Sequence, residues 1–542
     1  MKKVLRNNKV TILVLIIAMM LSSALLIGCS GQKTTEPADT AKPKETTDEQ
    51  KQEETIKDEE IVLAAPRDVA PGKEDAFFTS VILYIWEPLI GMGENGEPVP
   101  KLATSWEASE DKKEWTLKLR EGVIFHNGEK FNANSVVANF NRYKKMKSRN
   151  SKFYTFNVDK VYPGLIDCEK TDDFTVKITF KNPLPTLPYN MVNFGSPIYS
   201  SDSFDENGDF VGIPSATGPF KLVEMEKDSY CVLESYKGYY GEKAKAEKIR
   251  VKVIPDAQTR YSALKAEEIM GVMDLGAITP ALAEELLKDD RFEKSVEKST
   301  ISHYISANGN KPPFDNLNMR KAISLALDRQ LIVDEFYKGL GKPTQNILNY
   351  ASPFEKIIEH EYDIEKAKQL AKEALKGEKK DIDMIVPSAF TQKYPYKEEA
   401  EYIQATLKEL GLNVNILIYD WPTFKELRKN GEFNLSMHIQ GLPNMEPYSI
   451  FDRFMRSNGS TNIAYNLGYK NDRVDELMDK LDQTLDLDER AKIYDELQDL
   501  SAEELPTIPL FCDANLIVFN KKIDGYKSII YGTTLPELHW RK

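Results

Sequence analysis

Cysteine and histidine are both scarce in this chain of 542 residues. The four cysteines, Cys29, Cys168, Cys231 and Cys512, have no paired spacing, which excludes a disulfide framework and a paired-cysteine metal site. The five histidines are too few for a dense metal site made of protein side chains. We therefore expect no cofactor and assign no metal ligands.

Catalytic motifs are missing as well. The sequence has no nucleophile elbow, and the pair His360-Glu361 lacks the second histidine of a zinc-protease helix because Ile364 stands in its place. The glycines of Gly91–Gly96 match a dinucleotide fingerprint, but Pro98 follows at once, so the segment is predicted to be a turn. The sequence therefore predicts a protein that is not an enzyme.

Positive charge is in deficit, since 72 lysines and arginines face 85 aspartates and glutamates, a net charge of −13. No face rich in lysine or arginine stands out, and this argues against nucleic acid as a partner. A hydrophobic content of 41% and a charged content of 29% are typical of a globular protein. The length exceeds that of one ordinary core, so we expect at least two domains.

A long apolar run occurs only at Val10–Ile27, after a positively charged start. It is short for a spanning helix, and its flanks are those of a secretory signal. The ending Leu26-Ile-Gly-Cys29 resembles the lipobox of bacterial lipoproteins, which implies that residues 1–28 are a signal peptide and that Cys29 carries lipid. The alternative is an uncleaved anchor. In both cases the rest of the chain works outside the cytoplasm.

The segment that follows, residues 29–60, is dominated by Thr, Glu, Lys, Asp, Gln and Pro. Such a stretch buries too little apolar surface to offset the entropy lost on ordering. We expect a disordered linker after the lipidated cysteine. A solvated helix over residues 47–60 is the alternative.

From Ile61 the pattern becomes a mixture of α and β. Trp115–Arg120 alternates apolar and polar residues like a half-buried strand, and Asn127-Gly128 predicts a turn. A helix is expected over residues 134–146, with Asn134 as its cap. Further expected elements are a hairpin of strands 221–226 and 230–235, a strand over 249–254 and a helix over 257–267.

After Ser302 the helices and strands alternate more regularly. This order predicts an α/β fold whose sheet has helical crossovers. The expected helices cover residues 319–337, 364–375, 398–410, 422–429, 473–481 and 487–500. The expected strands cover residues 382–386, 414–419, 434–439 and 508–520.

Five longer strings of residues lie in one order along the chain. They are Trp86-Glu-Pro-Leu89, Pro100-Lys-Leu-Ala-Thr-Ser-Trp106, Trp115-Thr-Leu-Lys-Leu-Arg-Glu-Gly-Val-Ile-Phe-His-Asn-Gly128, Ala216-Thr-Gly-Pro-Phe220 and Met319-Arg-Lys-Ala-Ile-Ser-Leu-Ala-Leu-Asp-Arg329. In this order and spacing they resemble the family 5 extracellular solute-binding proteins of ABC importers. That family includes receptors for oligopeptides, dipeptides, nickel complexes and metallophores.

The resemblance implies a two-lobed α/β clamp like that of periplasmic binding proteins, of type II and in the large family 5 form. The first lobe would comprise residues 61–300, with an extra subdomain at about 95–215, and the second lobe residues 301–505. Residues 506–542 would return to the first lobe. It also implies a monomer that closes over its ligand and delivers it to an ABC permease with its ATPase subunits.

One branch of the family binds nickel complexes, and the tail Tyr531–Leu538 resembles this branch slightly. So does the segment Ala138–Arg142, which leads to Arg149. In that branch an arginine at the position of Arg149 approaches the bound chelate, and a guanidinium pairs well with a carboxylate. The alternative for Arg149 is an exposed side chain among neighbouring lysines.

The rest of the nickel pocket does not match intact. Lys152 stands where an aromatic residue is expected, although Phe153 and Tyr154 are adjacent. A second pocket arginine would align near Phe194. The histidine expected after Phe454–Arg456 has no counterpart.

The peptide branch matches no better. Its receptors commonly hold the ligand's amino group with an aspartate three residues before an acidic-Pro step. Here that step is Glu446-Pro447, and Pro443 stands in the place of the aspartate, with Asn444 and Met445 after it. Glu446 itself either neutralises an ammonium or serves as a cap or loop residue.

Four further residues are candidates for the cleft. Trp421 and Tyr448 either stack against a ligand or pack in the ordinary way. His438 ends a predicted strand that leads into the pocket loop, so it touches the ligand or takes a hydrogen-bonded core role. Thr79 lies where members of the family line the cleft.

Together these observations predict a lipid-anchored receptor on the extracellular face of the cell membrane, or on the periplasmic side in a Gram-negative cell. Its ligand would be a nickel complex or metallophore, slightly favoured, or a short peptide. The alternatives are an oligopeptide or dipeptide receptor and a peptide-sensing surface lipoprotein without a role in transport.

Overall fold

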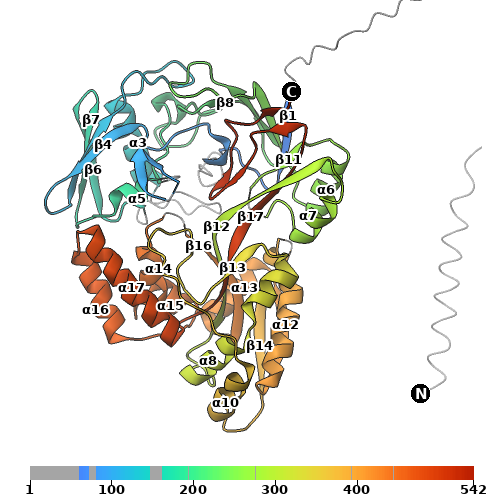
Figure 1. The fold of residues 1–542 in the computed structure, drawn as a ribbon. Coiled ribbons are helices and arrows are strands. Elements are labelled where there is room, and N and C mark those ends of the chain that lie inside the picture. Colours follow the sequence, from blue (N-terminus) through green and yellow to red (C-terminus); the bar gives the residue numbers. More distant parts are fainter. Residues whose placement is uncertain are drawn as a thin grey trace, which may run out of the picture. The chain divides into compact units, whose positions relative to one another are not determined.

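The structure is a computed structural model, and it describes residues 60–71, 81–94, 96–146, 161–192, 195–274, 276–391, 393–442 and 445–542. Helices and strands are mixed along the described chain, as Figure 1 shows. Several short elements connect the larger ones. They are η1 (Val81–Leu83), β2 (Ile90–Met92), β3 (Pro98–Pro100), α5 (Leu187–Met191), η3 (Ser201–Ser203), β18 (Ile523–Asp524), β19 (Ser528–Ile529), β20 (Gly532–Thr533) and β21 (His539–Trp540).

The largest sheet within the described residues has eleven strands, in the order β15-β14-β16-β12-β17-β11-β1-β10-β9-β8, with β13 paired to β17. Their bounds are β1 (Ile61–Ala65), β8 (Phe220–Glu226), β9 (Tyr230–Ser235), β10 (Lys248–Val253), β11 (Gly271–Val272), β12 (Phe292–Ala307), β13 (Gly341–Pro343), β14 (Lys380–Pro387), β15 (Leu412–Tyr419), β16 (Leu435–Gly441) and β17 (Ile508–Asn520).

At one end of this sheet, β1 is parallel to both β10 and β11, and its Leu63 pairs with Val251 and Gly271. The hairpin β8–β9 continues the sheet beyond β10. The helices α6 (Ala257–Lys265) and α7 (Pro280–Leu286) share a buried core with Ala64 and Val272. We call β1, β8–β11, α6 and α7, together with the β2–β3 pair and the C-terminal elements β18–β21 that share their core, the first lobe.

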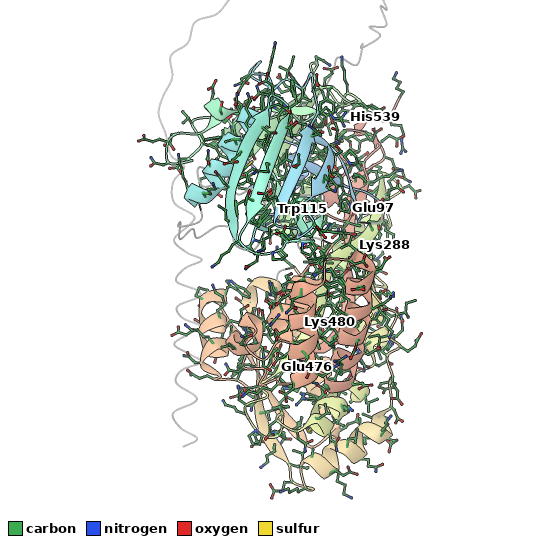
Figure 2. The ribbon with its side chains drawn as sticks, turned by 90° about the vertical axis from the view of Figure 1, so that its left-hand side faces the viewer. Glu97, Trp115, Lys288, Glu476, Lys480 and His539 are labelled. Atoms are coloured by element: carbon green, nitrogen blue, oxygen red, sulfur yellow. The ribbon has the colours of Figure 1, made fainter. Side chains whose placement is uncertain are left out.

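A separate sheet has the order β4-β5-β7-β6. In β5 the side chains of Trp115, Leu117 and Leu119 are buried while their neighbours are not, as expected for a strand with one face toward a core. Figure 2 shows Trp115 on this sheet. Its elements are β4 (Ala103–Ala108), β5 (Glu114–Leu119), β6 (Leu165–Asp172) and β7 (Thr175–Phe180), with the helix α3 (Ala133–Met146) against it.

At the other end of the large sheet, β14 is parallel to β15 and to β16. We call these strands and the helices that follow β12 the second lobe. The helix α13 shows why its segment is helical: the Asp420 side chain accepts from the N–H of Thr423 at its start, and Gly431 ends it with a φ of 72°. The helices are α8 (Leu317–Ala326), α9 (Arg329–Leu331), the π-helix η4 (Ile332–Phe336), α10 (Ile364–Ala374), α11 (Ser388–Thr391), α12 (Tyr396–Glu409), α13 (Trp421–Asn430), α14 (Tyr448–Phe454), α15 (Ser460–Ala464), α16 (Asp472–Gln483) and α17 (Leu487–Glu504).

The two long strands β12 and β17 join the lobes. Phe292 and Val518 belong to a core of the first lobe, whereas Ile305 and Ile508 belong to the core of the second. The antiparallel register between the strands shifts between Lys298 and Ser302 and again between His303 and Tyr304. The strands therefore bend where they pass from one lobe to the other.

Most expected elements lie within a few residues of the observed ones, and two expectations were wrong in detail. The helix α3 begins at Ala133, and the side chain that caps it is Asn132, which accepts from the N–H of Asn134 at 2.8 Å. The helix expected over residues 319–337 is interrupted, because Leu327 is extended and Asp328 caps a new turn by accepting from the N–H of Leu331. Sequence periodicity did not reveal this break.

Candidate functional site

The carboxyl ends of the parallel strands carry polar side chains in both lobes. In the first lobe Asp274 follows β11, and in the second lobe Lys393 and Tyr394 follow β14 and the short helix α11. Ligands of open α/β sheets bind beyond the carboxyl ends of the strands. A ligand site is therefore expected at these ends.

A cavity of about 30 Å³ lies between these two groups of residues. Its walls include Asp274 and Gly276 from the first lobe, Lys393 and Tyr394 from the second, and Asp513 from the joining strand β17. The volume has room for about two water molecules. A solute can enter only when the walls move apart.

The Asp274 carboxylate is already paired, because the Arg67 guanidinium lies 2.5 Å from it. The ammonium of Lys393 has no hydrogen bond or ion pair to any residue that the structure describes. Burial lowers the pKa of Lys393, and the charge of Asp274 opposes this effect. The aliphatic stem of Lys393 lies against Gly276, where an added Cβ would meet it at 3.4 Å.

Asp513 presents a second charge to the cavity and is 8% exposed. One of its oxygens accepts from the N–H of Ala514 at 2.8 Å, and the other lies 3.8 Å from Nε2 of His303. His303 is buried against Phe511, with ring centroids 4.2 Å apart, and burial lowers its pKa. The cavity therefore contains an aspartate backed by a neutral imidazole.

A buried carboxyl group lies behind the same wall. Tyr337, which lines the cavity, donates a hydrogen bond of 2.7 Å to Oε2 of Glu399. The other oxygen, Oε1, has no partner among the described residues, and burial raises the pKa of Glu399 to about 8. The neutral acid is therefore the form favoured by the fold at pH 7.

The lobes also touch on another side. The buried Met445 of the second lobe lies against Gly96, beside the β2–β3 pair, where an added Cβ would approach its Cγ to 2.6 Å. Tyr531 donates a hydrogen bond of 2.7 Å to the carbonyl of Leu442. These contacts and the one between Gly276 and Lys393 hold the lobes together in this conformation.

Among the residues that the structure describes, no cluster of three or more His, Cys, Asp or Glu side chains is placed to hold a metal ion. The thiols of Cys168, Cys231 and Cys512 are buried and unbonded to one another. Across the same residues, no helix combines the length and apolarity needed to cross a membrane. The cavity itself is lined by polar, aromatic and aliphatic side chains.

Comparison with known proteins identifies the family. The profile of "Bacterial extracellular solute-binding proteins, family 5 Middle" matches residues 97–462. The chain belongs to this family. Its relatives are binding proteins of transporters and not enzymes, so this solute-binding protein is not an enzyme either.

Two curated relatives illustrate the similarity. Heme-binding protein A of Haemophilus influenzae is 28% identical over 80% of this chain and 82% of its own length. The dipeptide-binding protein of Escherichia coli is 27% identical over 79% of this chain and 84% of its own length.

Solved structures show the same fold. HbpA2 from Haemophilus parasuis is 26% identical, with a TM-score of 0.76 over 89% of this chain and 100% of its own. NikA from Brucella suis in complex with Fe(III)-EDTA is 23% identical, with a TM-score of 0.79 over 89% and 100%. These neighbours are two-lobed periplasmic binding proteins, and the solute-binding protein shares their α/β fold.

Of the predicted site residues, His438 lies in the core of the second lobe and is 1% exposed. Its ring stacks with Tyr304 at 5.4 Å and meets Tyr465 edge-on, and Nδ1 lies 3.4 Å from the hydroxyl of Ser306. Burial and the charge of Arg428 lower its pKa well below the usual value. This placement corresponds to the core role that the sequence left open.

Glu446 is also buried and paired within the second lobe. One oxygen accepts from Arg490 at 3.2 Å and from the Tyr494 hydroxyl, and the other accepts from the N–H of Tyr448 at 2.9 Å. Glu446 therefore accepts from the first N–H of α14 and balances a buried arginine. The Tyr448 hydroxyl donates to Asp482 at 2.6 Å, away from the cavity.

Trp421 is the most exposed of the described candidates, at 37%. It opens α13 and stacks on Phe424, with centroids 5.7 Å apart. It also lies 5.5 Å from the ring of Phe390 in α11, the helix that precedes Lys393. Trp421 thus lies at the carboxyl edge of β14 and β15, and it does not line the cavity that contains Asp274 and Lys393.

The remaining candidates fall outside the described residues. They are Thr79, Arg149, Phe153, Tyr154, Phe194 and Asn444, together with the lipidation site Cys29. Sequence reasoning missed the cavity residues Asp274, Lys393, Tyr394 and Asp513. For Asp274 one signal was available, a charged residue just beyond a buried apolar strand.

Proposed function

We propose that this solute-binding protein captures a short peptide between its lobes and delivers it to an ABC permease and its ATPase subunits. The observation that carries the proposal is the cavity between Asp274 of the first lobe and Lys393 of the second, with Asp513 of a joining strand in its wall. A ligand that contacts both lobes and a joining strand stabilises the closed state, because it binds fully only when the lobes meet.

The charges on the cavity walls suit a peptide better than the metal chelate that the sequence slightly favoured. The cavity offers charges of both signs, Lys393 and Asp513, which suit a solute with a carboxylate and an ammonium. The curated relatives include a dipeptide-binding protein and glutathione-binding proteins. A metal chelate, a metallophore or heme remains the alternative ligand.

We further propose that residues 1–28 are removed, that Cys29 carries lipid and that residues 29–60 tether the protein to the membrane. The first lobe then comprises residues 61–300, with its extra subdomain at about 95–215, and the second lobe residues 301–505. Residues 506–542 return to the first lobe. Cys29→Ser should release the protein from the membrane, and continued fractionation with membranes after processing would refute lipidation.

Native mass spectrometry of the protein after incubation with candidate ligands tests the proposal. The panel contains unblocked di- to tetrapeptides, nickel–histidine and hemin. Retention of peptides supports it, whereas retention of nickel–histidine or hemin alone assigns the other ligand class. Deleting the gene and measuring peptide uptake then separates transport from sensing, since a sensor leaves uptake unchanged. Arg149→Ala should weaken retention of a chelate ligand alone if Arg149 anchors one.

A further inference from the structure

Three ionic side chains face the cavity, and only two of them are available to a ligand. The Asp274 carboxylate is engaged by Arg67 at 2.5 Å. Among the described residues, the Lys393 ammonium has no hydrogen bond or ion pair, and Asp513 has no lysine or arginine partner; Nε2 of His303 lies 3.8 Å from its carboxylate. Within the part of the chain that is described, the cavity thus holds a lysine without an ion-pair partner and an aspartate that accepts hydrogen bonds but has no cation beside it.

Both groups are partly removed from water. Asp513 is 8% exposed, and burial lowers the pKa of Lys393. An unpaired charge in such a place costs free energy, which an opposite charge on a ligand recovers. Lys393 and Asp513 therefore favour the binding of a solute that carries charges of both signs.

The neighbours of Asp513 favour a cation on its free side. The imidazole of His303 is kept neutral by burial, so it does not neutralise the carboxylate. Tyr394, the other polar neighbour of Asp513 in the cavity, keeps its proton because burial and the carboxylate both raise its pKa well above the usual value. Within the part of the chain that the structure describes, Asp513 therefore has hydrogen-bond donors but no cation beside it, and a ligand's ammonium group would supply one.

We infer that Asp513 anchors the ligand's ammonium group and Lys393 its carboxylate. This inference rests on the proposed function and names how the site recognises a peptide.

The test compares three peptide libraries of identical sequences: unblocked tripeptides, N-acetylated tripeptides and C-amidated tripeptides. Each is competed for the full chain and read by native mass spectrometry. The unchanged protein should prefer unblocked peptides over either blocked form by about tenfold or more, the effect of losing one desolvated charge pair. Asp513→Asn should abolish the preference at the amino end alone, and Lys393→Gln the preference at the carboxyl end alone.

Glu401→Gln is the control, because it removes a carboxylate from an exposed position of α12 that does not line the cavity. It should leave both preferences in place. Thermal melts of the three variants establish that each is folded before its preferences are compared. A folded Asp513→Asn protein that still rejects N-acetylated peptides overturns the inference.

The outcomes separate this inference from the proposed function. If the unchanged protein retains unblocked and blocked peptides equally, the anchors are wrong while the peptide receptor stands. If it retains no tripeptide but retains nickel–histidine or hemin, the proposed ligand class fails and the anchors with it.

Discussion

The buried Glu399 gives the sharpest prediction about stability. Its carboxyl group is fully buried, accepts one hydrogen bond of 2.7 Å from Tyr337, and has a pKa raised to about 8 by burial. We consider the substitution Glu399→Gln, which keeps the shape and an acceptor for Tyr337 but cannot ionise. The variant thus mimics the protonated form at every pH.

The sign follows from proton linkage. The folded protein holds this proton up to about pH 8, whereas the unfolded chain releases it above the ordinary value of 4.5. The stability of the unchanged protein therefore falls, relative to Glu399→Gln, as the pH rises from 4.5 to 8. The full difference is roughly 5 kcal/mol, at about 1.4 kcal/mol for each pH unit. Below pH 4.5 and above pH 8, the free energies of unfolding of the two proteins change with pH in parallel.

Urea unfolding at a series of pH values from 4 to 9 measures this difference. The amide group of the new glutamine has no hydrogen-bond partner. This lowers the free energy of unfolding of the variant by an amount that does not depend on pH. Glu401→Gln, an exposed position on the same helix, is the control and should follow the unchanged protein at every pH. A difference between Glu399→Gln and the unchanged protein that stays constant across the series would refute a buried neutral acid.

Three other predictions follow from single contacts. Glu446→Gln should lower the free energy of unfolding by about 3–5 kcal/mol, because it leaves the buried Arg490 without its carboxylate partner. Glu285→Gln, which removes an exposed ion pair, should leave the free energy of unfolding nearly unchanged; urea melts compare the two variants. Gly96→Ala should enlarge the radius of gyration in X-ray scattering, because its Cβ clashes with Met445, while Gly128→Ala, equally left-handed but in open space, should not. Below pH 6.5 stability should fall, because the unfolded chain protonates His438 while the folded core keeps it neutral; His438→Gln should reduce this slope by about 1.4 kcal/mol per pH unit.

Helices and strands were predictable wherever the apolar residues of the sequence are also the residues that the fold buries. In Trp115–Leu119 the apolar residues are the buried ones, and the strand lies where alternation placed it. The helix over residues 319–337 shows the limit of this reasoning. Its apolar spacing continues through Leu327, but Asp328 caps a second helix, and buried Arg329 satisfies carbonyls of Ser324 and Pro509. That choice depends on tertiary partners.

The candidate site was less predictable, since a site between lobes consists of residues far apart in sequence. The family resemblance directed attention to Glu446 and His438, whose side chains the fold uses for a buried ion pair and for core packing. Asp513 lies inside the predicted strand 508–520, and a charged residue within a strand predicts a position that faces solvent. Only the register between β12 and β17 brings it to the boundary between the lobes.

The position of Asp513 connects recognition to movement. It lies on β17 opposite the shift in register between Lys298 and Ser302, where the strands pass from one lobe to the other. The cavity beside it is smaller than any peptide while Lys393 rests against Gly276, so the conformation described here competes with binding. The apparent affinity is then the intrinsic affinity reduced by the fraction of molecules whose lobes have separated. A ligand held by Asp513 and Lys393 shifts this equilibrium only because it reaches both a joining strand and the second lobe at once.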